Sequence, residues 1–171
     1  MKQAQVQGQV IMYALTLIIT ALILVYGYKY IVKITNTSKT VELVNFETSL
    51  TSDIAKLSSD YGSVKIESYP VPTEVKEVCF YQKKYDPISC PESLPAGTNP
   101  LVIDQITDKT GNNVFIVLKD GVEYLDLGKI EVPKNACPLL CITVQSNRLK
   151  LRLEGLGDGV LVEEYTTSGS G

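Results

Sequence analysis

The sequence contains no histidine among its 171 residues. Without an imidazole, the Ser/His/Asp and Cys/His arrangements that serve nucleophilic catalysis are excluded. The commonest transition-metal ligand and the usual pH switch near neutrality are missing for the same reason. We therefore predict that the protein is not an enzyme and that it holds no cofactor and no metal ion.

A basic excess is also lacking. The net charge is −3 and charged residues make up 20% of the chain. Nucleic-acid binding needs a basic patch or stripe, so we expect no nucleic-acid partner. The length suffices for one globular domain with its own hydrophobic core.

The stretch from Val10 to Tyr28 has no charged residue. As a helix with a rise of roughly 1.5 Å per residue, it is about as long as a bilayer core is thick. Tyr26, Tyr28 and Tyr30 gather at its end, as in an interfacial aromatic belt. A cleaved signal peptide would have a shorter apolar core, roughly 7 to 15 residues, and a small-x-small site after it. We predict a transmembrane helix over 10–28, preceded by a leader or cytoplasmic tail over 1–9.

The lysines and the cysteines predict opposite orientations of this helix in the membrane. Lys2 precedes the apolar stretch, whereas Lys29, Lys33 and Lys39 follow it. The positive-inside rule alone would place the rest of the chain in the cytoplasm. The cysteines favour the opposite side, since disulfides form in oxidising compartments. We predict an extracytoplasmic C-terminal part.

Helical periodicity resumes after the polar segment Ile34–Ser38, which predicts a kink or short break. The apolar side chains that follow are spaced three or four residues apart and share one face. They are Leu43, Phe46, Leu50, Ile54, Leu57 and Tyr61. Gly62 is a natural C-cap, so we predict one long helix over 10–61.

Short alternating runs separated by Pro, Gly and Asn follow, and they predict a mainly antiparallel β domain over 62–165. The fold class is therefore α+β, with the long N-terminal helix first. Tight turns are expected at Gly111-Asn112, Asp120-Gly121, Ser146-Asn147 and in Gly155–Gly159, and a disordered tail over 166–171. The predicted strands are Ser63–Ser68, Val75–Gln82, Val102–Ile106, Asn113–Lys119, Val122–Leu127, Lys129–Val132, Cys141–Gln145, Leu149–Glu154 and Val160–Glu164.

The chain has four cysteines, Cys79, Cys90, Cys137 and Cys141. An even number in a β domain predicts two disulfides, for which three connectivities exist. A local scheme joins Cys79 to Cys90 and Cys137 to Cys141. A nested scheme joins Cys79 to Cys141 and Cys90 to Cys137, and we favour it because it pairs the strand cysteines with each other. A four-thiolate zinc site is the alternative, but its usual C-x-x-C pair is absent.

The polar leader that ends in Gly8-Gln9 directly before the apolar helix resembles the leader of archaeal type IV pilin-like proteins. In that family a prepilin peptidase cuts after the glycine. The stretches Asp60–Val64, Glu77–Phe80 and Leu153–Gly159 are similar to those of small archaeal membrane-anchored surface proteins. The resemblance implies a structural subunit, cleavage between Gly8 and Gln9, and no chemistry.

The leading hypothesis is thus a pilin-like structural protein of the cell membrane and cell surface. Its partners would be the lipid bilayer, copies of itself through the N-terminal helix, and prepilin peptidase with its assembly machinery. The alternative is a permanently membrane-anchored extracytoplasmic binding module that does not polymerise. Asn36-Thr37-Ser38 is a glycosylation sequon, which makes Asn36 a candidate acceptor.

Overall fold

The computed structural model describes the backbone of residues 3–83, 98–108, 110–133 and 138–166, and their side chains except those of 3–9 and 35–37. The chain divides into two compact units, Met1–Val41 and Glu42–Gly171. Helix α1 (Gln3–Ser58) supplies all of the described first unit and the start of the second. The α+β class is confirmed, because a long helix precedes a β domain of two sheets.

Helix α1 is continuous through Ile34–Ser38, so the predicted break is wrong. The segment contains neither Gly nor Pro, and its Thr and Asn residues each disfavour a helix by only about 0.7 kcal/mol or less. The helix ends at Ser58, three positions before the predicted end at Tyr61. A turn follows, in which Gly62 has φ +78° and its N–H donates to the Gly155 carbonyl at 2.8 Å. Tyr61 is therefore off the apolar stripe and 83% exposed.

Sheet A has the strand order β1-β7-β8-β5, and all its pairs are antiparallel except the short parallel pair β5–β8. Its strands are β1 (Val64–Pro70), β7 (Arg148–Gly155), β8 (Val160–Glu164) and β5 (Ile130–Glu131). Strand β7 alternates buried and exposed residues along its length, as its sequence predicted. One face of sheet A is consequently exposed to solvent, and the other packs on the hydrophobic core.

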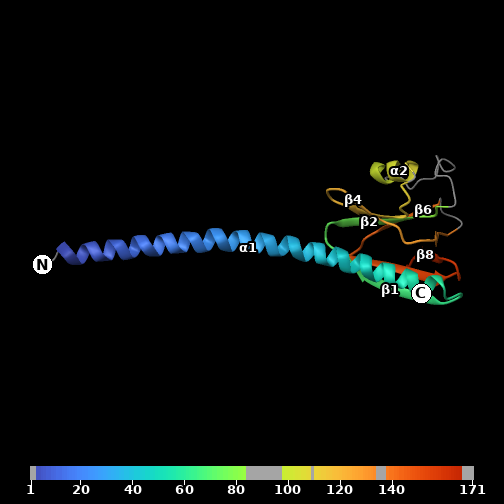
Figure 1. Cartoon of the computed structure of the whole chain (residues 1–171), viewed down its shortest axis with the longest axis horizontal. Helices are drawn as coiled ribbons and strands as arrows, with labels where there is room; N and C mark the ends of the chain where they lie inside the picture. The colour runs from blue at the N-terminus through green and yellow to red at the C-terminus, as the bar shows by residue number, and fades with distance from the viewer. Residues whose placement is uncertain (1–2, 84–97, 109, 134–137, 167–171) are drawn as a thin grey trace, which may run out of the picture. The chain divides into compact units, whose positions relative to one another are not determined.

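Sheet B has the order β4-β3-β2-β6 and is entirely antiparallel. Its strands are β4 (Val122–Leu125), β3 (Val114–Leu118), β2 (Val75–Tyr81) and β6 (Leu139–Thr143). The inner strands β2 and β3 are nearly all buried, because both faces of this sheet are covered. Figure 1 labels β4, β2 and β6 of this sheet, with α2 on one side of them.

Residues Val102–Ile106 form helix α2 (Pro100–Thr107), and the predicted strand there is wrong. Asn99 caps the helix by accepting a hydrogen bond from the Leu101 N–H at 3.0 Å, and Pro100 occupies the first turn. Val102 and Ile106 are four apart, so in a helix both face sheet B. A spacing of four residues also places two side chains on one face of a strand, so the sequence pattern fitted a strand and a helix equally well.

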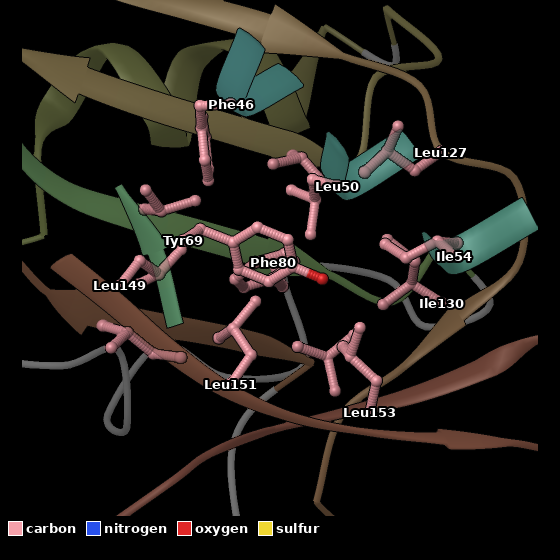
Figure 2. Close-up of a cluster of buried hydrophobic side chains, with 14 of the residues drawn as sticks. Phe46, Leu50, Ile54, Tyr69, Phe80, Leu127, Ile130, Leu149, Leu151 and Leu153 are labelled. Carbon is pink, nitrogen blue, oxygen red and sulfur yellow. The ribbon is translucent and has the colours of Figure 1, made fainter. Parts of the chain in front are cut away.

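One core joins the helix to both sheets, as Figure 2 shows for its central residues. The α1 stripe contributes Phe46, Leu50, Ile54 and Leu57, as predicted. Sheet A adds leucines and valines from β7 and β8, and sheet B adds Val78 and Phe80 with residues of β3 and β6. A second cluster lies on the other side of sheet B, under α2. It comprises Cys79, Tyr81, Val102, Ile106, Phe115, Val117 and Leu139.

The one buried polar side chain of the described residues is that of Asn113. Its Nδ2 donates to the Gly128 carbonyl at 2.6 Å, and its Oδ1 accepts from the Leu127 N–H at 2.9 Å. A fully buried amide of this kind is stable only when it is hydrogen-bonded. Asn113 therefore fixes the connection between β4 and β5.

Candidate membrane-spanning and helix-packing surface

The first unit carries a large apolar surface on α1. By length and composition this helix could cross a membrane, and no part of its most apolar window is buried. The apolar surface consists of exposed large side chains on all sides of the helix. They are Val10, Ile11, Met12, Tyr13, Leu15, Leu17, Ile18, Ile19, Leu22, Ile23, Leu24, Val25, Tyr26, Tyr28, Tyr30, Ile31, Val32 and Ile34.

The threonine hydroxyls inside this surface are hydrogen-bonded by the helix itself. The Thr16 hydroxyl donates to the Tyr13 carbonyl at 2.9 Å, and the Thr20 hydroxyl donates to the Thr16 carbonyl at 2.8 Å. Backbone groups within a helix are paired in the same way, which is the requirement for a segment in hydrocarbon. The surface between Val10 and Tyr28 thus has no charge, and its two threonine hydroxyls are hydrogen-bonded within the helix.

The same helix behaves differently in the second unit. There only one stripe is apolar, and it is buried: Phe46 is 1% exposed and Leu50 is 0% exposed. Helices that are hydrophobic on every side need burial on every side, whereas a one-sided helix is satisfied by one neighbouring core. The β domain covers the apolar stripe in the second part of α1, whereas none of the most apolar window is buried.

The tyrosines at the end of the apolar stretch are exposed, and Lys29 and Lys33 lie among and just beyond them. Aromatic rings with a polar tip are favoured at the boundary between hydrocarbon and headgroups. Lysines at such positions reach outward with their ammonium groups. This end of the stretch is suited to a membrane–water boundary.

Gly8, Gln9 and Asn36 lie in α1, which is helical from Gln3 onward. The side chains of Gln9 and Asn36 are outside the described part of the chain. Cleavage between Gly8 and Gln9 and glycosylation of Asn36 therefore remain predictions. The leader residues 3–9 extend the apolar helix rather than forming a separate element.

A disulfide joins Cys79 of β2 to Cys141 of β6, which are directly opposite each other in sheet B, with Cα atoms 4.0 Å apart. This bond excludes the local scheme and agrees with half of the nested one. Cys90 and Cys137 lie outside the described residues, so their pairing stays a prediction. Each would be the other's only remaining partner within the chain.

Among the described residues, Glu77, Cys79 and Cys141 are close enough for their ligand atoms to share a metal ion. The two sulfur atoms are bonded to each other, however. Cysteine ligates zinc only as a thiolate, so the oxidised pair leaves Glu77 as the single ligand here. The described residues thus favour the disulfide over the zinc alternative.

A polar network fastens the second part of α1 to sheet A. Lys65 Nζ and the Tyr69 hydroxyl both donate to Asp53 Oδ2, at 2.6 and 2.7 Å. Burial raises the pKa of Asp53, but the hydrogen bonds from Lys65 and Tyr69 outweigh it and lower the pKa overall. Burial and the Asp53 carboxylate together raise the pKa of Tyr69 far above its ordinary value of 10.0. The sequence placed Asp53 on the polar face of the helix, and only its position beside Ile54 hints at a buried edge.

Replacing Tyr69 with phenylalanine is expected to lower the free energy of unfolding by about 1.5 kcal/mol at neutral pH, because a hydrogen bond to a charged group is lost. The folded-state pKa of Asp53 lies below its ordinary value of 3.8. Its stabilisation is thus present at neutral pH and lost as the pH falls through and below 3.8. The difference between wild type and Y69F should accordingly shrink in acid.

Urea unfolding at pH 7 and pH 3, followed by circular dichroism, measures this difference. Tyr124→Phe is the matched control, since Tyr124 is 45% exposed on β4 and its hydroxyl makes no hydrogen bond within the described residues. A Y69F effect no larger than that of Y124F would show that the network does not stabilise the fold.

We compared the chain with models of known protein families, with curated proteins and with solved structures. None of the three comparisons finds a match.

Proposed function

We propose that the chain is a non-enzymatic structural subunit similar to the archaeal type IV pilins. In this proposal α1 first anchors it in the cell membrane and then bundles with copies of itself to form a surface filament, with the β domain outside. The observation that supports the proposal is the apolar surface of Val10–Ile34, which is exposed on every side of the helix.

Burial of this surface is strongly favourable. Each Å² of apolar surface removed from water contributes about 25 cal/mol, so a helix with this many exposed aliphatic side chains does not stay in water. Lipid and neighbouring helices are equally suitable environments for it, because both are apolar. Transfer from a bilayer to a helix bundle therefore requires no change in the helix itself.

The disulfide supports an extracytoplasmic β domain. Disulfides persist in oxidising compartments and are rare in the cytosol. Cys79 and Cys141 both belong to the β domain. This argument favours the outer location against the lysines that follow Tyr28.

Expression of the full chain in cells with a prepilin peptidase and pilus assembly machinery, followed by electron microscopy and membrane fractionation, tests the proposal. Wild type should be found in membranes and in filaments. Leu17→Arg should be depleted from both, because an arginine near the centre of a membrane helix costs about 2.5 kcal/mol or more. Leu17 is 71% exposed, so its replacement disturbs no packing within the chain.

Val44→Arg is the matched control, because Val44 is an exposed apolar residue of the same helix outside the apolar surface. It should behave as wild type. If wild type forms no filaments and its solubilised form is a monomer, the filament part of the proposal is wrong. The N-terminal mass then separates the two functions: a chain that begins at Gln9 fits the pilin-like subunit, and one that keeps residues 1–8 fits the permanently anchored binding module.

A further inference from the structure

A groove of about 370 Å³ opens in the β domain between the end of β6 and the strands β7 and β8. Its volume lies within the range of small-molecule sites, roughly 300–1,000 Å³. The turn between β6 and β7 borders it, and there Gln145 and Arg148 are bridged by backbone hydrogen bonds of 3.3 and 3.0 Å. Ser146 and Asn147 both have positive φ in this turn, so the border of the groove has one defined shape.

Two basic side chains line the groove, and within the described residues neither belongs to an ion pair. Arg148 and Lys150 are two residues apart on β7, which places both side chains on the same face of sheet A. Both are exposed, and neither forms an ion pair with any residue in the described part of the chain. Glu164 also lines the groove but pairs with neither of them.

The next basic residue on this face, Arg152, differs from these two because it is paired with acids. Arg152 is paired with Glu154 at 2.7 Å and with Glu163 at 2.5 Å. The strand thus presents three basic side chains in a row. The two neighbouring glutamates form ion pairs only with the third, Arg152. Within the described residues no acid is paired with Arg148 or Lys150, so both can contact a ligand, and an arginine with a lysine is suited to hold an oxyanion.

The rest of the lining consists mostly of neutral hydrogen-bonding groups. Thr143 and Ser146 contribute hydroxyls, and Gln145 contributes an amide. Tyr165 offers an aromatic ring with a hydroxyl, and its N–H donates to the Lys150 carbonyl at 3.3 Å, which holds it beside the cation. A bare ion would use few of these groups, whereas a sugar has hydroxyls for all of them.

We propose that this groove binds an acidic saccharide. Its carboxylate or sulfate group lies between Arg148 and Lys150, and its hydroxyls contact the neutral side chains of the β6–β7 turn and Tyr165. The site belongs to the β domain alone, and it would serve either a filament subunit or a permanently anchored module.

Isothermal titration calorimetry of the full chain in a polyoxyethylene detergent tests the site, since sugar-headed detergents would compete. The probes are a disaccharide that contains glucuronate, a neutral disaccharide of the same size, and sodium sulfate. Wild type should bind the acidic disaccharide, with affinity that falls as salt is raised, and should not bind the neutral one. The double variant R148Q/K150Q should weaken binding at least about tenfold.

The matched control is K76Q/K119Q, which removes two exposed lysines outside the groove and should leave the affinity within about twofold of wild type. Circular dichroism checks that both variants fold. Equal binding by R148Q/K150Q and wild type, or absence of binding by wild type, would overturn the site. Full displacement of the disaccharide by an equal concentration of sulfate would overturn the saccharide as its ligand. Because these measurements use the solubilised chain, their outcome is independent of whether filaments form.

Discussion

Replacing Gly155 with alanine is expected to lower the free energy of unfolding by about 3 kcal/mol, at the upper end of the cost of overpacking. A Cβ at this position would lie 2.1 Å from the Asp60 carbonyl oxygen and 2.3 Å from that of Leu57. Both are backbone atoms, so no side chain can rotate away. Either the end of α1 or the end of β7 would have to move, and the hydrogen bonds between Gly155, Gly62 and Ser63 would be disturbed.

Gly121→Ala is the matched control for this substitution. A Cβ there meets nothing within 4 Å, and the residue has no positive φ. Its replacement should be neutral or stabilise the protein by about 0.5 kcal/mol, since alanine restricts the unfolded chain. Urea unfolding of both variants in neutral detergent gives the comparison. If G155A and G121A are equally stable, the close approach of α1 and β7 does not constrain the fold.

Leu50→Ala is expected to lower the free energy of unfolding by about 4 kcal/mol, because it removes a fully buried side chain and leaves a cavity. Leu50 is central among the residues of Figure 2, where the α1 stripe meets residues of both sheets. Neither sheet can move alone to fill the space, so little of the cavity should collapse. We therefore expect a loss in the free energy of unfolding above the middle of the range of about 2–5 kcal/mol for leucine-to-alanine substitutions in cores.

Val44→Ala gives the corresponding control for Leu50. Val44 is 51% exposed on the other side of the same helix, and alanine is a better helix former than valine. We expect a change of less than about 0.5 kcal/mol. Unfolding followed by near-ultraviolet circular dichroism reports the loss of tertiary packing around the core tyrosine. A Leu50→Ala effect below about 1 kcal/mol would mean that α1 is not an integral part of this core.

Much of the β domain could be predicted from the sequence, because its strands obey a simple rule. Strict alternation along Arg148–Glu154 and short apolar runs between turn residues give eight of the nine predicted strands, with ends that differ by at most two positions. The turn at Ser146-Asn147 was also predictable, since Asn tolerates the left-handed conformation found there. These signals depend only on neighbouring residues, and the strands and the turn that they predict are present in the structure.

The errors arise where two interpretations share one local pattern. Val102 and Ile106 are spaced for a strand face and for a helix face alike, and the Asn99-Pro100 start signal decides between them. At Ile34–Ser38 the β-branched and polar residues weaken a helix without stopping it. Tyr61 continues the apolar spacing beyond the residue at which the chain turns toward β1.

Contacts between distant segments could not be predicted. The Asp53 network joins residues 12 and 16 positions apart through the packing of α1 on β1, and neither spacing nor composition signals it. The groove beside Arg148 and Lys150 depends in the same way on how the end of β6 meets β7 and β8. A basic residue on a wet strand face is ordinary in sequence, and only the arrangement of acids around it shows which cations stay unpaired.

The disulfide between Cys79 and Cys141 also has a mechanical consequence. A protein held at its N-terminal helix and pulled at its C-terminal end carries tension along the covalent chain. The bond bridges two positions 62 residues apart, so the force passes directly from β2 to β6. The bypassed segment, roughly 200 Å of contour length if extended, cannot be drawn out while the bond is intact. Helix α2 and the strands β3, β4 and β5, which lie between the two cysteines, are thereby removed from the line of force.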